Sequence, residues 1–231
     1  SQAKRFGELG KAHSLYNAWA AVLQRSANAG ALLGKVDAGW RDDPAFLFAR
    51  VENLRNQQKY PEAAALLRQA PKDTAKLVNP GEWWNERRII ARGLADLGDF
   101  AEAYRIVANH NATSAVDVAD AEFHAGWYAL RAMRDPATAS RHFNALLQTS
   151  NRPLSASRAY YWLGRTAEAG GPGDARDFFA KAAAHPGTFY GQLAAARIGT
   201  KTLNVTYPSP SNGDRERFAG REAVRAIDRL E

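Results

Sequence analysis

The chain has 231 residues, of which 45% are hydrophobic and 24% are charged, so it can bury a substantial core and is not disordered as a whole. It contains no cysteine, which excludes disulfides, cysteine nucleophiles and thiolate metal sites. The sequence has no run of about 18 apolar residues, so we expect no membrane-spanning helix. The net charge of +7 favours an anionic partner but does not identify it.

The first part of the chain is predicted to be helical. Residues 9–40 are rich in alanine and leucine, and Gly30, Gly34 and Gly39 interrupt the pattern, which indicates two or three short helices. Asp43 and Pro44 then combine an N-cap with a proline at the first helical position, so a longer helix is expected to begin there. Its partner helix is expected from Pro61 to just before Pro71.

The same signals predict three further helix pairs and one single helix. Proline or an acidic residue marks the beginning of most of these helices, and glycine marks several of the turns. The expected ranges are 82–97 with 100–109, a helix from 116 with 136–149, a helix from 153 with 175–184, and a single helix over 186–199.

In each pair, the second helix carries an alanine followed one helical turn later by a large apolar residue. The alanines stand 40, 36 and 36 residues apart, a spacing typical of helix-pair repeats. A small residue lets two helices approach closely, and the large residue fills the groove between them. These positions are Ala63/Leu67, Ala103/Val107, Ala139/Phe143 and Ala175/Phe179. The sequence therefore predicts an all-α fold, a right-handed α-superhelix (solenoid) of tetratricopeptide-like helix pairs over residues 1–200.

Residues 201–216 are predicted to be a linker, because prolines, serines and a glycine cluster there. Residues 217–231 are predicted to start a further helical domain that continues beyond this chain. A helix there would carry an arginine every four residues, and a solvated face explains this stripe better than phosphate contacts do. We therefore expect no nucleic-acid partner. The stripe comprises Arg217, Arg221, Arg225 and Arg229.

Two acidic clusters could in principle supply catalytic carboxylates. Glycosidic bonds are commonly cleaved by one carboxylic acid at the scissile bond together with a second carboxylate. Acids in or just before a first helical turn also cap the helix and complement its dipole, which is the better interpretation here. We therefore predict no catalytic residue among Asp42, Asp43, Asp117, Asp120 and Glu122.

The sequence predicts no metal site and no cofactor. The histidines show no metal-binding spacing, and Glu122 and His124 stand two residues apart, which places them on different faces of a helix. Neither a phosphate-binding loop nor a dinucleotide-binding fingerprint occurs. The histidines are interpreted as surface or partly packed residues: His13, His110, His124, His142 and His185.

Two aromatic clusters are the remaining candidates for recognition. Flat apolar rings can stack on sugars or on bases. Most of these rings are expected to pack between repeats, but adjacent rings cannot all face one core. At least one ring of each cluster should therefore be partly exposed. The clusters are Trp83-Trp84 and Tyr160-Tyr161-Trp162.

Several segments together resemble the soluble lytic transglycosylases of bacterial cell walls, in the helical part that precedes their catalytic domain. The resemblance extends over about residues 45–231. The segments are WWNERR at 83–88 with AEAY at 101–104, AEFHAGW at 121–127, and AYYWLGR at 159–165 followed by FYGQLAA at 189–195.

The resemblance implies a U-shaped superhelical domain that precedes a smaller helical domain and a lysozyme-like catalytic domain. It also implies a periplasmic enzyme, with a signal peptide that was removed or lies outside this chain. Such enzymes cleave the bond between N-acetylmuramic acid and N-acetylglucosamine in peptidoglycan and leave a 1,6-anhydro product.

The family's catalytic motifs are missing from this sequence. The catalytic glutamate of the family lies in Glu-Ser-x-Phe, and Glu-Ser does not occur here. The expectation is therefore a non-catalytic scaffold of a lytic transglycosylase. It would meet glycan strands through a catalytic domain outside this chain and pack against the C-terminal domains that this chain lacks. The alternative is a tetratricopeptide-like adaptor that grips another protein. Candidate contacts with glycan or with neighbouring domains are Trp83, Trp84, Tyr161, Tyr190, Arg221 and Arg225.

Overall fold

The computed structural model describes residues 11–77, 79–200, 209–227 and 229. Within those ranges every regular element is a helix, and no strand is present. None of the helices in the described ranges is both long enough and apolar enough to cross a bilayer. The chain divides into two units, Ser1–Thr200 and Lys201–Glu231.

Short helices form the beginning of the first unit, as the interrupted pattern of residues 9–40 predicts. They are α2 (His13–Leu23), α3 (Ala29–Gly34) and the 3₁₀ helix η1 (Ala38–Trp40). Their apolar faces pack with the first turns of the next helix into a small core. That core includes Leu15, Ala18, Val22, Leu33, Val36, Phe46 and Ala49.

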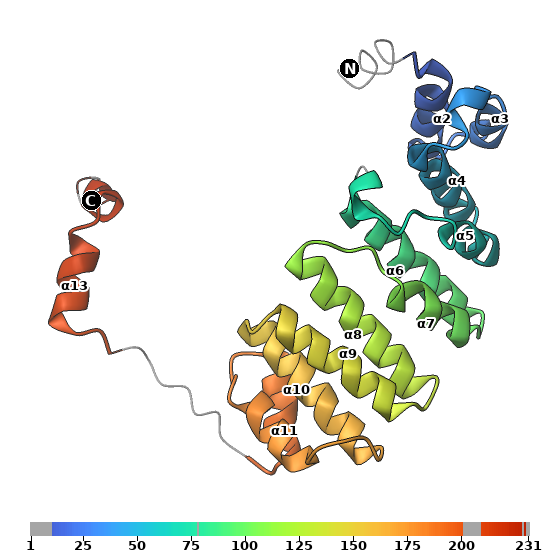
Figure 1. The fold of residues 1–231 in the computed structure, drawn as a ribbon. Helices are drawn as coiled ribbons and strands as arrows, with labels where there is room; N and C mark the ends of the chain where they lie inside the picture. The colour runs from blue at the N-terminus through green and yellow to red at the C-terminus, as the bar shows by residue number, and fades with distance from the viewer. Residues whose placement is uncertain (1–10, 78, 201–208, 228, 230–231) are drawn as a thin grey trace. The chain divides into compact units, whose positions relative to one another are not determined.

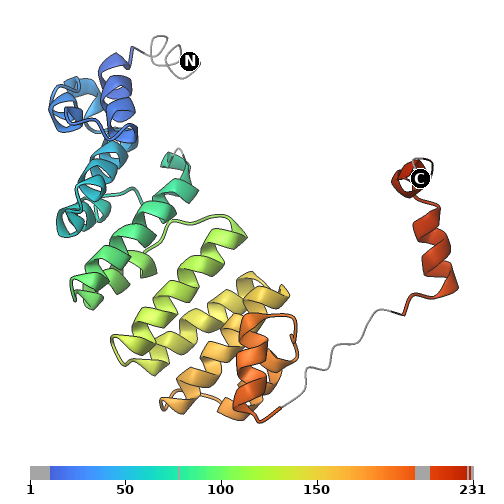
Figure 2. The ribbon, with the colours of Figure 1, turned by 180° about the vertical axis from the view of Figure 1, so that it is seen from behind.

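Four helix pairs and a single helix follow, stacked side by side in chain order (Figure 1, Figure 2). The prediction of an all-α array of helix pairs is confirmed. The pairs are α4 (Pro44–Asn56) with α5 (Tyr60–Leu67), α6 (Pro80–Asp96) with α7 (Phe100–Ala108), α8 (Ala115–Arg131) with α9 (Pro136–Thr149), and α10 (Pro153–Glu168) with α11 (Ala175–Ala183), followed by α12 (Phe189–Arg197). The 3₁₀ helix η2 (Thr74–Lys76) joins the first two pairs.

Local capping explains where these helices begin. The Asp43 carboxylate accepts a hydrogen bond from the Ala45 amide at 2.7 Å, and Asp135 accepts one from the Thr138 amide at 2.9 Å. A proline follows each of these two caps, as expected. Such caps satisfy amides that have no partner within the helix.

The pairs hold together through their neighbours. Helix α10, for example, contacts α8, α9, α11 and α12. The first helices α4, α6 and α8 likewise each contact the first helix of the next pair. Each pair therefore buries its apolar face only when the adjacent pair is folded.

The repeated alanine and its large partner are buried at seven of the eight positions, and only Ala175 is partly exposed. The structure adds a small residue that the pattern did not reveal. Gly126 on α8 faces Phe143, and Gly164 on α10 faces Phe179. A Cβ atom at either glycine would lie 2.6 Å from the ring, so the first helix of these pairs also needs a minimal side chain.

Replacing Gly164 with alanine is expected to lower the free energy of unfolding by about 1–3 kcal/mol, because the added methyl group overpacks the contact with Phe179. Urea unfolding followed by circular dichroism measures the loss. Gly187→Ala is the matched control, since a Cβ there meets nothing within 4 Å. Equal midpoints for the two variants would contradict the account of the close approach.

The second unit contains α13 (Asn212–Ala219) and α14 (Glu222–Ile227). Residues 212–216, predicted to belong to the linker, are therefore helical. The cause is a capping box, in which Ser211 and Asp214 satisfy each other's backbone amides. The rest of the predicted linker lies mostly at residues 201–208, outside the described residues.

The four arginines of the predicted stripe do not share one continuous helix. Arg217 lies on α13, Arg225 lies on α14, and Arg221 lies in the break between them. These arginines, and Arg229 near the end of the chain, are all exposed.

Candidate functional site

The tryptophans of the first aromatic cluster are both buried, so the prediction that one of them is partly exposed is wrong. Trp83 is 3% exposed and Trp84 is 1% exposed. Helix α6 lies between α4 and α8, so the two rings point to different neighbours. Trp83 packs edge-on against Phe48 with ring centroids 5.0 Å apart, whereas the Trp84 indole N–H donates to Asp120 at 3.2 Å. Both rings are therefore almost completely covered by the packing between repeats.

The second aromatic cluster has both buried and accessible members, as predicted. Tyr161 is buried, with its ring centroid 5.6 Å from that of Phe179 and 5.4 Å from that of Tyr190. Tyr160 and Trp162 are partly exposed. Tyr190 is also partly exposed, so it can contact glycan or a neighbouring domain, whereas the buried Tyr161 cannot.

A row of polar side chains crosses the first helices of three successive pairs and the single helix after them. We call Arg88, Asp120, Arg158 and Tyr190 the polar row. They lie on α6, α8, α10 and α12. Asp120 Oδ2 lies 3.4 Å from Arg88 Nη1, and Asp120 Oδ1 lies 3.9 Å from Arg158 Nη1. One carboxylate thus faces two guanidinium groups, and the row retains an excess positive charge.

The guanidinium of Arg158 is only partly satisfied within the protein. It lies over the Phe123 ring, 4.2 Å from the ring centroid, and its buried Nε has no hydrogen-bond partner among the described residues. Burial lowers the pKa of Arg158, which reflects the loss of water around the cation. Arg158 and Tyr190 also line a pocket of about 260 Å³ between the beginnings of α10 and α12. A carboxylate entering this pocket would meet a positive charge beside an aromatic ring.

His124 completes the surroundings of Asp120. Its Nδ1 lies 2.8 Å from the Asp120 carbonyl oxygen, which fits an N–H donor at that nitrogen. Burial lowers the pKa of His124, so the ring is neutral at neutral pH and adds no positive charge to the polar row.

Glu122 points to a different face of α8 from His124, as the spacing predicts. Its Oε2 lies 2.7 Å from His142 Nδ1, its Oε1 lies 3.3 Å from His110 Nε2, and Tyr104 contacts His142 Nε2 at 3.1 Å. Burial raises the pKa of Glu122, but the hydrogen bonds from the two histidines outweigh it and hold the pKa at about 2. A carboxyl group that stays ionised cannot protonate a glycosidic oxygen, so Glu122 does not fit the role of a catalytic acid.

The interpretation of the acidic residues as caps is right for only part of the set. Asp43 caps α4, and Asp117 lies in the first turn of α8, where it accepts a hydrogen bond from Ser114. It is wrong for Asp120 and Glu122, which lie one turn further along α8 and bind side chains of neighbouring helices.

Replacing Glu122 with glutamine is expected to lower the free energy of unfolding by about 1–3 kcal/mol at pH 7. Because folding lowers the pKa of Glu122 from 4.5 to about 2, its ionised form stabilises the fold above pH 4.5. That contribution disappears as the pH falls toward 2, so the difference between variant and wild type should shrink. Urea unfolding from pH 7 to pH 3 measures it, with the exposed Glu62→Gln as control. A difference that is constant with pH would contradict this assignment.

The remaining predicted residues do not gather into one site. Arg221 and Arg225 are exposed in the second unit, and Trp83, Trp84 and Tyr161 serve packing in the first. No cluster of three or more metal-ligating side chains suited to an ion occurs among the described residues.

Sequence reasoning missed Arg158, although a signal was present. Arg158 follows Asp120 by 38 residues, close to the interval between the repeated alanines, so the two occupy similar places in successive pairs. The polar row is the best candidate site in the described part of the chain.

Comparison with known proteins matches the chain to no family model, no curated protein and no solved structure.

Proposed function

We propose that this chain is the non-catalytic helical-repeat scaffold of a periplasmic lytic transglycosylase. In this proposal the helix pairs continue as a right-handed, tetratricopeptide-like superhelix that holds a catalytic domain acting on peptidoglycan. The observation that carries it is where the resembling segments lie. Segments 83–88, 121–127 and 159–165 fall on α6, α8 and α10, the first helices of three successive pairs. The resembling segments therefore recur at the same structural position in successive repeats.

The polar row gives this scaffold a means of contacting its polymer. Peptidoglycan carries carboxylates on its peptide stems, and the row combines Arg88 and Arg158 with one acid. The net charge of +7 adds long-range attraction to an anionic polymer. In this function the row guides the polymer, and the catalytic domain cleaves it.

Incubation of the chain with purified peptidoglycan should release no 1,6-anhydro-muropeptides. The same chain joined to a lysozyme-like domain with a Glu-Ser-x-Phe motif should release them. Product from the chain alone would refute the assignment of a non-catalytic role.

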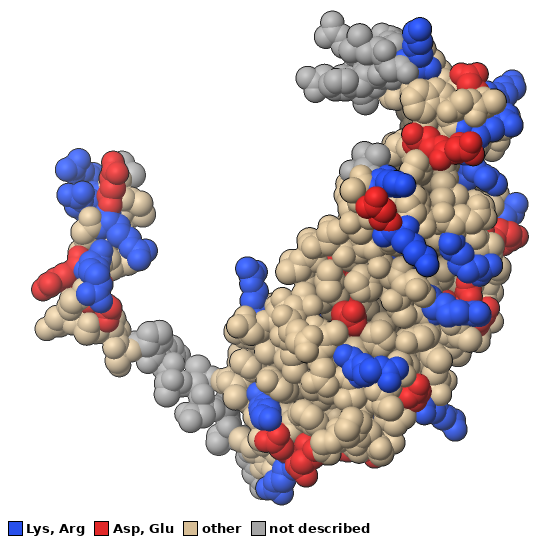
Figure 3. Space-filling model, in the orientation of Figure 1, with Lys and Arg blue, Asp and Glu red and all other residues tan. Residues whose placement is uncertain are grey.

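A second candidate function is a protein-binding adaptor, and one observation favours it. Val116, Leu154 and Phe189 lie at the beginnings of α8, α10 and α12 and are 74%, 73% and 66% exposed. Figure 3 shows a mostly uncharged surface along the edge where α8 and α10 begin. Apolar side chains exposed in a row are typical of protein interfaces. Two results together would favour the adaptor. A purified partner protein would bind the wild type but not the Leu154→Ser variant, and the chain would not bind peptidoglycan.

A further inference from the structure

A second pocket lies in the first unit, away from the polar row. It has a volume of about 430 Å³ and lies between α3, η1 and α4. Its walls combine apolar side chains, two arginines, one amide and two glycines. The lining residues are Gly30, Leu33, Gly34, Arg41, Phe46, Arg50, Asn53 and Leu54.

The two arginines are positioned without a carboxylate partner. Arg41 donates from Nε to the Val36 carbonyl at 3.0 Å and from Nη2 to the Gly34 carbonyl at 3.3 Å. The guanidinium of Arg50 lies over the Phe46 ring, 5.6 Å from its centroid. Neither arginine forms an ion pair with a described acidic residue. Both side chains are exposed, and backbone carbonyls hold one side of the Arg41 guanidinium, so its remaining N–H groups can donate to a ligand.

Nothing in the described part of the structure requires glycine at positions 30 and 34. Gly30 and Gly34 belong to α3, neither has the positive φ angle that favours glycine, and a Cβ atom at either would meet nothing within 4 Å. Glycine weakens a helix relative to alanine. What the two share is a place in the wall of this pocket, where a bare backbone lets a ligand approach closely.

We propose that this pocket binds the carboxyl-terminal end of a short peptide. The carboxylate pairs with Arg41 and Arg50, as arginine forks favour. The apolar side chain of the last residue packs against Leu33, Phe46 and Leu54, and only the terminal residues enter, because the volume is near the lower end for ligand pockets. The inference does not depend on the proposed function.

The test is isothermal titration of the full chain with N-acetyl-alanyl-leucine and with its C-terminal amide. The acid should bind roughly tenfold more tightly than the amide, because only the acid pairs with the arginines. Arg50→Gln should remove most of this difference, whereas Arg105→Gln on α7 should preserve it. Equal binding of acid and amide, or no binding at millimolar peptide, would overturn the proposal.

A glycine variant separates binding from folding. Gly34→Ala should raise the unfolding midpoint, because alanine favours the helix and the added methyl group meets no protein atom. It should also weaken binding of the acid peptide by at least about fivefold, since the methyl group occupies the pocket wall. Gly39→Ala, likewise in open space but outside the lining, should leave binding unchanged. Undiminished binding to Gly34→Ala would contradict the close approach.

Discussion

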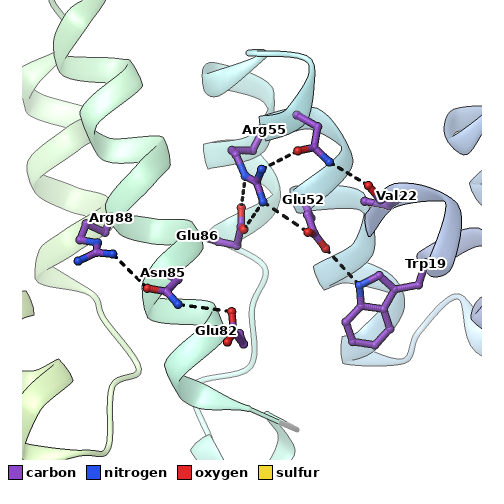
Figure 4. A network of polar contacts seen from close by, with 9 residues as sticks. Trp19, Val22, Glu52, Arg55, Glu82, Asn85, Glu86 and Arg88 are labelled. Carbon is purple, nitrogen blue, oxygen red and sulfur yellow. Dashed lines mark hydrogen bonds and ion pairs between the residues drawn. The ribbon is translucent and has the colours of Figure 1, made fainter. Parts of the chain in front are cut away.

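Replacing Arg55 with methionine is expected to lower the free energy of unfolding by about 3–5 kcal/mol at pH 7. Arg55 on α4 donates from Nε and Nη2 to the two carboxylate oxygens of Glu86 on α6, at 2.9 and 2.6 Å (Figure 4). Its Nη2 also lies 3.4 Å from Glu52 Oε1. Both acids are buried, since Glu52 is 8% exposed and Glu86 is 5% exposed. Methionine would leave two carboxylates in the interior without their cation.

The same network extends to α2, so its loss should reach beyond one helix pair. The Trp19 indole N–H donates to Glu52 Oε2 at 3.1 Å, and the Asn56 amide donates to the Val22 carbonyl at 3.1 Å. Figure 4 shows the chain of contacts running from α2 across α4 to α6. Arg55 therefore links α4 to α6 directly, and its neighbour Glu52 links α4 to α2.

The cost of Arg55→Met should depend on pH. Burial already raises the pKa of Glu52, and loss of the neighbouring cation would raise it further. An acid whose pKa is higher in the folded state takes up protons on folding, so the variant should recover stability as the pH falls from 7 to 5. Urea unfolding at both pH values measures this recovery.

Two further variants test the reason for the loss. The double variant Arg55→Met with Glu86→Leu should recover much of the stability, because it removes a buried charge together with its partner. Arg92→Met, at an exposed position on α6, should change the free energy of unfolding by less than about 0.5 kcal/mol. A loss below about 1 kcal/mol for Arg55→Met would contradict the role given to this network.

Replacing Phe143 with alanine is expected to cost about 3–5 kcal/mol, because the ring is fully buried and its removal leaves a cavity. The ring lies against Gly126 on α8 and stacks on Trp162 of α10, with centroids 6.2 Å apart. It thereby joins its own pair to the next one.

Urea unfolding measures the effect, and two variants serve as comparisons. Phe143→Leu should retain a substantial part of the stability because it fills more of the space. Phe100→Ala, at a position that is 40% exposed on α7, should cost less than about 1.5 kcal/mol. A similar cost at positions 143 and 100 would contradict the burial argument.

Helix positions could be predicted from the sequence because the signals that set them are local. Asp43-Pro44 and Asp135-Pro136 each place a cap and a proline side by side, and both mark the helix starts found. The start of α13 also has a local signal, the capping box of Ser211 and Asp214. Nearby prolines and serines favour a linker, so the pattern of this segment predicts no helix there.

The candidate site could be predicted only in part, because its contacts join residues far apart in the sequence. Trp84 and Asp120 are 36 residues apart, and Glu122 meets His142 from 20 residues away. Whether Trp83 reaches solvent depends on α4, which covers it and which no pattern around Trp83 specifies. Local patterns therefore indicate capping for Asp120 and Glu122 and do not reveal the polar row.

Sedimentation of the chain with purified peptidoglycan tests most directly whether the polar row contacts an anionic polymer. The wild type should sediment with the polymer at low salt and be released as salt rises. The variant Arg88→Gln with Arg158→Gln should lose most of this binding. Arg105→Gln with Arg176→Gln, exposed on the second helices α7 and α11, changes the net charge equally and should still bind. Equal binding by both double variants, or no binding by the wild type, would contradict the account.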